Sequence, residues 1–163
     1  MPLPPQPLSQ YVAIAEPHHA CGPLSNAAEL SGMIVMVERG PSSDVCPMPD
    51  RYFGNKVVRL QEANAVAAIV VNNIPNEPLI YMGATSGDAA ARVQIPSVFV
   101  SKETGDLFKQ QLGTGRLHVS LSKPAGRLPM LTPGNPQRGT TLHSQFMFYE
   151  IWTPPGRDSG VIS

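Results

Sequence analysis

Short runs of apolar residues recur along the chain and predict buried strands. Residues 30–38 (LSGMIVMVE) hold five apolar positions in a row, too few for a helix and typical of a strand buried on both faces. Residues 66–71 (VAAIVV) form a second run, which ends at the turn-forming residues 72–75 (NNIP). Residues 95–100 (IPSVFV) form a third, shorter run. We therefore expect a core sheet built from buried strands.

The hydrophobic period changes between the first two runs. In residues 52–65 apolar side chains recur every three or four positions, which is typical of an amphipathic helix. A strand, a helix and a second strand in this order predict a parallel βαβ unit with a right-handed crossover. The apolar positions are Phe53, Val57, Leu60 and Ala63 or Asn64, and the polar positions between them are Lys56, Arg59 and Glu62.

A second helix and a closing strand follow the third run. The helix is expected over residues 102–112, with Ser101 as its N-cap and Gly113 as its stop. Residues 116–122 (RLHVSLS) alternate between polar and apolar, which predicts a half-exposed strand. The side chains expected to point inward are Leu107, Phe108 and Leu112 from the helix, and Leu117, Val119 and Leu121 from the strand.

The positions of proline divide the chain into three parts. The sequence contains 18 prolines, which crowd both ends, whereas residues 56–74 contain none. We therefore expect a proline-rich segment over residues 1–12, a domain over 13–123 and a proline-rich extension over 124–163. Within the extension, residues 142–152 (LHSQFMFYEIW) are aromatic and β-prone, so they could pair with the edge of this domain or with that of another chain.

Charge and hydropathy exclude several classes of partner. Twelve basic residues balance twelve acidic ones, and only 15% of the chain is charged, so nucleic acid and anionic membranes are disfavoured as partners. No run of about 18 apolar residues predicts a membrane span, and residues 1–10 lack the features of a signal peptide. The sequence is thus expected to be either a mature chain or an excised fragment.

The sequence lacks recognisable signals for catalysis. Neither a Gly-x-Ser-x-Gly elbow nor a glycine-rich phosphate loop occurs, and nothing supplies the base that a nucleophilic cysteine needs. His18 and His19 beside Cys21 suggest metal ligands, but adjacent strand residues point in opposite directions and no second ligand cluster follows. We expect no enzyme activity, no metal and no cofactor, with both histidines solvated in a loop.

Several segments, in their order, resemble the protease-associated (PA) domain over about residues 13–122. PA domains are non-catalytic modules of subtilisin-like proteases, aminopeptidases, vacuolar sorting receptors and membrane RING ligases. The resemblance implies an α/β fold of the β-sandwich or open-barrel kind, with a parallel βαβ core, two flanking helices and, here, extended proline-rich ends. It rests on residues 20–24 (ACGPL), the strand ending at Arg39-Gly40, Cys46, Lys56, residues 62–73 (EANAVAAIVVNN) and residues 95–101 (IPSVFVS).

The chain departs from the family's pattern at two places. The second cysteine of the family typically follows the Arg-Gly turn directly, whereas residues 41–45 intervene here and the lysine is delayed to Lys56. The family commonly has Ala-Gly-Ala where this chain has Ala63-Asn64-Ala65. Asparagine is the next residue after glycine to tolerate a positive φ, so the helix can still end at Asn64.

The resemblance also pairs Cys21 with Cys46, the two cysteines of the chain. A bridge between them would stabilise the fold by roughly 3–4 kcal/mol in the chain-entropy model. It would also place the chain in an oxidising compartment, either extracellular or in the vacuolar-secretory lumen. The alternative is two unrelated reduced thiols in a cytosolic protein.

Ligand contact is implied for the loops at the ends of the sheet, which here are residues 41–53, 73–81 and 83–94. The alternative is that these are ordinary solvated loop residues. The candidate ligand-binding residues are Arg51, Tyr52, Asn73, Asn76, Tyr81 and Arg92, and the arginines and tyrosines among them are of the type that dominates binding energy at interfaces.

Three hypotheses for function follow. In the first, the domain is a non-catalytic protein-binding module that recruits a peptide or protein ligand. In the second, the chain also self-assembles into a homo-oligomer or filament through its terminal segments. In the third, it is the PA fragment of a larger secreted protease, aminopeptidase or sorting receptor. The residues expected to mediate assembly are Phe146, Phe148, Tyr149, Ile151 and Trp152.

Overall fold

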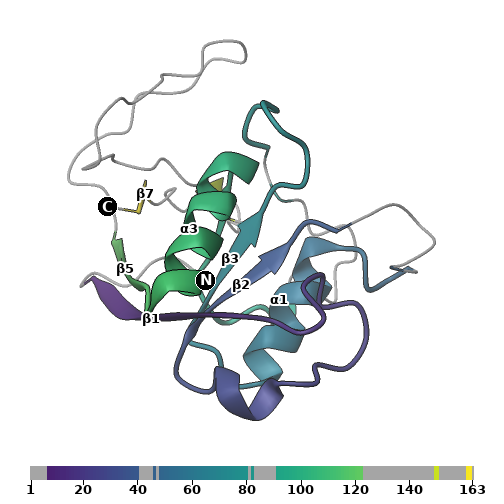
Figure 1. The fold of residues 1–163 in the computed structure, drawn as a ribbon. Coiled ribbons are helices and arrows are strands. Elements are labelled where there is room, and N and C mark those ends of the chain that lie inside the picture. The colour runs from purple at the N-terminus through teal and green to yellow at the C-terminus, as the bar shows by residue number, and fades with distance from the viewer. Residues whose placement is uncertain are drawn as a thin grey trace.

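The described part of the chain forms a mixed α/β fold around one curled sheet (Figure 1). The computed structural model describes residues 7–40, 46, 48–80, 82 and 91–122, and the backbone of two short strands beyond them. The five longer strands, β1 to β5, form a half-barrel, the open form of the expected fold. The short strands β6 and β7 add to its two edges, so the full strand order is β6-β4-β3-β2-β1-β5-β7. The strands are β1 (Leu8–Ile14), β2 (Ile34–Glu38), β3 (Ala67–Val71), β4 (Ser97–Val100), β5 (His118–Ser122), β6 (Tyr149–Glu150) and β7 (Val161–Ile162).

Strands β1 to β4 are parallel, and the predicted βαβ unit is confirmed by the pairing of β2 with β3. Both faces of this sheet are covered. Val35 and Val37 pack in a cluster with α1 (Phe53–Glu62), whereas Ile34 and Met36 pack in a second cluster with α3 (Lys102–Thr114). Because neither face meets water, β2 and β3 are apolar at nearly every position instead of alternating.

Strand β1 is the element that the sequence pattern did not predict. It pairs in parallel with β2 and antiparallel with β5, so it lies inside the sheet. It also runs across the boundary placed between residues 12 and 13. Its side chains alternate between the sheet's two sides and Val12 is the one that is fully buried, so the apolar run needed to recognise it is missing.

Helix α1 ends at the asparagine that replaces the family's glycine. Asn64 has φ 59°, and its N–H donates to the carbonyl of Gln61, while the N–H of Ala65 donates to the carbonyl of Leu60. These two bonds form a Schellman motif, in which the residue after the helix adopts the left-handed conformation. The prediction that Asn64 ends the helix is confirmed.

Helix α3 begins as predicted and ends later. The Ser101 hydroxyl accepts from the N–H of Thr104 at 3.2 Å, which confirms the N-cap. Gly113 lies within the helix, which runs to Thr114, so the prediction of Gly113 as the stop is wrong. A glycine late in a helix interrupts no hydrogen bond, and the chain leaves the helix only at Gly115. A short 3-10 helix, η1 (Ala27–Leu30), precedes β2.

Helix α3 approaches β3 closely at a glycine. A Cβ at Gly105 would lie 2.0 Å from Cγ1 and 2.8 Å from Cγ2 of Val71, far inside van der Waals contact. The missing side chain lets the backbone of α3 rest directly on Val71. The contact fixes the height of α3 above the sheet.

Two short strands of the extension pair with the edges of the domain. Tyr149 pairs with Phe99 and Glu150 with Val98, so the extension adds a strand to this domain's own β4 edge. Phe146, Phe148, Ile151 and Trp152, which were expected to mediate assembly, lie outside the described residues. Among the helices of the described part, none has the length and apolar character to cross a membrane.

Candidate binding rim at the carboxyl edge of the sheet

The loops that leave the parallel strands meet at one edge of the sheet. The carboxyl ends of β1, β2, β3 and β4 share this edge because the four strands are parallel. On open α/β sheets, ligands bind outside the carboxyl ends of the strands. We refer to the described loop residues here, 16–22, 39–40, 46, 48–52 and 72–79, as the carboxyl-edge rim.

A disulfide joins two loops of the rim. Cys21 and Cys46 are bonded, with their Cα atoms 5.3 Å apart, which confirms the pairing that the resemblance implied. Cys46 is fully buried, whereas Cys21 is partly exposed. The bridge ties the loop after β1 to the loop after β2.

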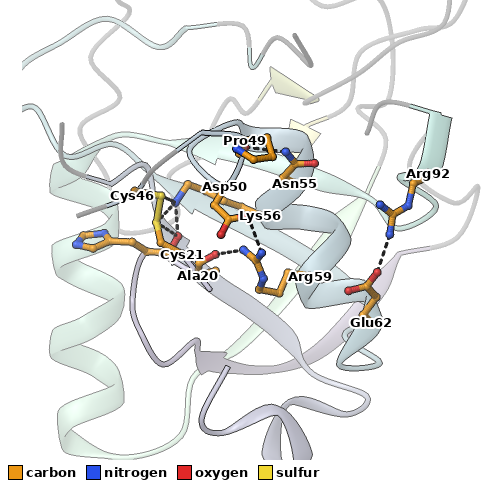
Figure 2. Close-up of polar contacts among 11 residues, drawn as sticks. Ala20, Cys21, Cys46, Pro49, Asp50, Asn55, Lys56, Arg59, Glu62 and Arg92 are labelled. Atoms are coloured by element: carbon orange, nitrogen blue, oxygen red, sulfur yellow. Dashed lines mark hydrogen bonds and ion pairs between the residues drawn. A yellow bond between two sulfur atoms is a disulfide. The ribbon is translucent and has the colours of Figure 1, made fainter. Parts of the chain in front are cut away.

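The side-chain nitrogen of Lys56 lies beside this disulfide (Figure 2). Its side chain is fully buried, its Nζ donates to the carbonyl of His19, and the same Nζ lies 3.4 Å from Cys21 Sγ and 3.8 Å from Cys46 Sγ. Burial, and secondarily the charge of Arg59, lower the pKa of Lys56 to about 8. The lysine therefore carries its charge at neutral pH at a cost to the folded state.

The prediction that Lys56 lies among the polar positions of the helix is wrong. Lys56 follows Phe53 by three residues and precedes Leu60 by four, so it lies on the stripe that faces the core. That spacing is the signal that could have revealed it. A lysine on such a stripe needs acceptors inside the protein, and the His19 carbonyl and the sulfurs are the ones the structure shows.

Arg59, one turn further along α1, joins three segments (Figure 2). Its Nη2 lies 2.8 Å from Oδ1 of Asp50, and its Nη1 donates to the carbonyl of Ala20. Ala20 has φ 46°, a left-handed conformation that is rare for alanine, and it is fully buried. Asn55 also donates to the carbonyl of Pro49 at 2.7 Å. Helix α1 thereby holds the two disulfide-linked loops against the domain.

A second polar network connects the ends of β2 and β3. Arg39 donates to the Asn72 side chain at 3.1 Å and also pairs with Glu77, and Asn72 donates to Glu77 at 2.7 Å. Asn72 is buried, so these bonds satisfy an amide that water does not reach. The hydrogen bond from Asn72, together with the charge of Arg39, lowers the pKa of Glu77. Asn73 donates to the carbonyl of Gly40 at 2.8 Å.

Glu38, at the end of β2, lies between two basic groups. Lys109 of α3 donates to one carboxylate oxygen, and Nδ1 of His19 lies 3.5 Å from the other. Burial raises the pKa of Glu38, but the hydrogen bond and charge of Lys109 outweigh it, and the pKa is lowered. Burial lowers the pKa of His19. In the described part of the chain, no three His, Cys, Asp or Glu residues gather as a metal site needs.

The structure separates the candidate ligand-binding residues into two groups. Four lie on the rim: Arg51, Asn73 and Asn76 are exposed, and Tyr52 is half-buried at the start of α1. Arg92 instead lies beside the end of α1, where it pairs with Glu62 at 2.7 Å, well away from the disulfide (Figure 2). Tyr81 lies outside the described residues.

The rim also carries two exposed apolar residues that the sequence pattern did not predict. Met48 is 50% exposed and Ile74 is 43% exposed. Neither belongs to a periodic pattern, and both lie in loops next to turn-forming residues, so no sequence signal distinguishes them from buried loop residues. The 72–79 loop that carries Ile74 is held to α3 by the N–H of Asn76, which donates to Glu103 at 2.9 Å.

Comparison with known protein families assigns most of the described chain to one family. A sequence model of the PA domain matches residues 7–108, which is more than half of the chain. The chain belongs to the PA domain family. The matched range begins before β1, so it includes the strand that the sequence pattern missed.

Relatives of this PA domain occur in longer proteins. The chain is 36% identical over 106 residues to receptor homology region, transmembrane domain- and RING domain-containing protein 2 of Arabidopsis thaliana, covering 63% of this chain and 21% of that protein. It is 30% identical over 128 residues to E3 ubiquitin-protein ligase ZNRF4 of Homo sapiens, covering 76% of this chain and 27% of that protein. The matched part of the chain thus spans 21% and 27% of the length of these two relatives.

A solved structure with a similar region is BSAP, a zinc aminopeptidase from Bacillus subtilis. The TM-score is 0.48 at 18% sequence identity, and the aligned part covers 78% of this chain and 30% of that structure.

Proposed function

We propose that this PA domain is a non-catalytic protein-binding module that recruits a peptide or protein through its carboxyl-edge rim. The observation that carries the proposal is the presence of exposed side chains on loops whose bases are fixed. Met48, Arg51 and Ile74 project from loops held by the Cys21–Cys46 disulfide and by the Arg39 network. Loops ordered before binding lose less conformational entropy when a ligand docks.

The chemistry of the rim favours an extended peptide segment. Apolar Met48 and Ile74 can take apolar ligand side chains, and methionine adapts to ligands of varied shape. The exposed side-chain amide of Asn76 can pair with a ligand backbone, and so can the amide oxygen of Asn73, whose Nδ2 donates to the carbonyl of Gly40. Arg51 can pair with a carboxylate.

The compartment we propose is extracellular or lumenal. The Cys21–Cys46 disulfide is stable in oxidising compartments and rare in the cytosol. The Arabidopsis relative carries a transmembrane domain by name. We further propose that this PA domain serves as the binding part of a longer protein of receptor, RING ligase or aminopeptidase type, because its relatives are several times longer.

The test is peptide binding to the oxidised full chain, with matched surface variants. A displayed library of extended peptides is selected against the chain, and the dissociation constants of the selected peptides are measured by calorimetry. We expect Ile74→Asp to weaken binding at least tenfold. The control is Leu107→Asp on α3, a residue that is 37% exposed and lies outside the rim, and binding should change less than twofold. Equal losses from both variants, or no binding by any peptide, contradict the proposal.

A second candidate function is self-assembly through the extension. The pairing of β6 with β4 supports it, because the same strand addition between two chains would link copies. Sizing of the full chain against a chain that ends at residue 123 tests the idea. If the extension mediates assembly, only the full chain should elute as a species larger than a monomer. Elution of both chains as monomers contradicts the idea.

A further inference from the structure

We propose that the Cys21–Cys46 disulfide is a reducible bridge, and that the ammonium group of Lys56 stabilises the thiolates that form when the bridge opens. The positive charge is buried, no carboxylate among the described residues forms an ion pair with it, and it lies within 3.8 Å of both sulfurs. A disulfide carries no charge, whereas a thiolate carries a full negative one. The lysine therefore interacts more favourably with the reduced pair than with the bridge.

Access to the two sulfurs gives the reaction a direction. Cys21 is partly exposed and Cys46 is fully buried, so an external thiolate reaches Cys21 Sγ. Attack there forms a mixed disulfide between the reductant and Cys21, and the electron pair of the broken bond leaves on Cys46 Sγ as a thiolate. A thiol with a lower pKa leaves faster as a thiolate, and the charge of Lys56 lowers the pKa of the Cys46 thiol.

The reductant that completes the reaction is a dithiol. Its second thiolate attacks its own sulfur in the mixed disulfide, so the dithiol is oxidised to a disulfide and Cys21 is released as a thiolate. Two electrons pass to the protein, and the two protons of the dithiol pass to the released thiolates or to water. The cleaved bridge no longer ties the loop after β1 to the loop that leads to Arg51.

Among the described residues, the other charged groups that act on Lys56 are themselves paired. Arg59 pairs with Asp50, and Glu38 pairs with Lys109, so the opposite charges of Arg59 and Asp50 partly offset each other at the lysine. His19 lies next to the lysine through its backbone carbonyl, and its ring faces Glu38. Lys56 is the basic side chain that the described contacts place against the sulfurs. Its replacement should therefore isolate the effect.

The experiment measures the redox equilibrium of the oxidised full chain. The chain is equilibrated in buffers of reduced and oxidised dithiothreitol, free thiols are alkylated, and the reduced fraction is read by mass. We expect Lys56→Met to be at least tenfold harder to reduce than the unaltered chain, which is about 30 mV for a two-electron couple. Lys56→Arg keeps the charge and should remain within about threefold of the unaltered chain.

Two further measurements keep the result interpretable. Lys102→Met removes a half-exposed lysine of α3 that pairs with Asp106, and it should leave the equilibrium unchanged. In the reduced unaltered chain, thiolate absorbance against pH should show a thiol that titrates below the usual value of about 8.5. This readout needs no variant to fold. A thiol that titrates at or above 8.5, or a Lys56→Met chain reduced as easily as the unaltered one, overturns the proposal.

Discussion

Substitution of Gly105 by alanine tests whether α3 is seated on the sheet as the structure shows. The new Cβ would lie 2.0 Å from Cγ1, 2.8 Å from Cγ2 and 3.0 Å from Cβ of Val71. Carbon atoms in contact normally lie about 3.5–4.0 Å apart. Rotation of the Val71 side chain cannot relieve a clash that includes its own Cβ, so the backbones of α3 and β3 must move apart.

The magnitude follows from two opposed effects. Overpacking of a tight core site costs about 1–3 kcal/mol, and a clash with atoms fixed to both backbones belongs at the upper end. Alanine in place of glycine within a helix recovers about 1 kcal/mol. We expect a net loss of about 2 kcal/mol in the free energy of unfolding.

Urea unfolding followed by far-UV circular dichroism measures this loss. The matched control is Gly113→Ala in the same helix, where nothing lies within 4 Å of the new Cβ. At that position only the higher helix propensity of alanine acts, so Gly113→Ala should be more stable than the unaltered chain by about 0.5–1 kcal/mol. The double variant Gly105→Ala with Val71→Ala removes both Cγ atoms, and it should cost at least 1 kcal/mol less than the sum of the single changes.

Two outcomes would refute the reasoning. The first is that Gly105→Ala stabilises the chain as much as Gly113→Ala does, because the clash with Val71 would then be absent. The other is additivity of Gly105→Ala and Val71→Ala, because the two positions would then not be in contact.

Three other predictions concern the core and the rim. Asn64→Ala should lower the free energy of unfolding by about 1 kcal/mol, whereas Asn64→Gly should leave it unchanged or raise it by a few tenths of a kcal/mol, because φ 59° suits glycine. Thermal unfolding checks both variants, and equal stability of the two contradicts the Schellman end of α1. The pKa of Lys56, about 8 when folded, lies below its unfolded value of about 10.4, so the unfolded chain binds more protons between these values and stability rises with pH in this window. Urea titrations should show that, between pH 8 and 10.5, the free energy of unfolding of the unaltered chain rises by about 3 kcal/mol more than that of Lys56→Met. If the two chains change in stability with pH to the same extent, the burial of a charged lysine is contradicted. The double variant Cys21→Ala with Cys46→Ala should have a free energy of unfolding about 3.5 kcal/mol lower than that of the oxidised chain, as expected for a loop of 25 residues. A loss below 1 kcal/mol would contradict the entropic account of the disulfide.

Local patterns predicted those parts of the fold that local chemistry determines. Strands β2 and β3 are apolar at nearly every position because helices cover both sheet faces, and an unbroken apolar run shows this directly. Asn64 marks the end of α1 through its left-handed backbone conformation, and Ser101 marks the start of α3 through a side-chain hydrogen bond to a residue three positions later. In such cases the cause and the effect lie in the same short segment.

The parts that were missed depend on distant residues. Strand β1 is recognised only through β2 and β5, its partners in the sheet. The burial of Lys56 depends on acceptors in the loop after β1, more than thirty residues earlier in the chain. Arg92 comes from a loop that was expected to contact a ligand; its ion pair with Glu62 places it beside the end of α1, and its part in binding stays a prediction. Sequence spacing alone does not show on which side of the sheet a long loop returns.

The neighbours of β1 have a consequence for synthesis of the protein. The first strand of the sheet lies beside the last of its five longer strands, and the Ser9 hydroxyl donates to that of Ser120 across 111 residues of sequence. A growing chain therefore carries β1 with one edge unpaired until residues 118–122 leave the ribosome. During that interval its free backbone groups can pair with other nascent chains. The sheet cannot be completed by adding successive strands along one edge, because β5 pairs with β1 on the side opposite to β2, and productive folding has to wait for β5.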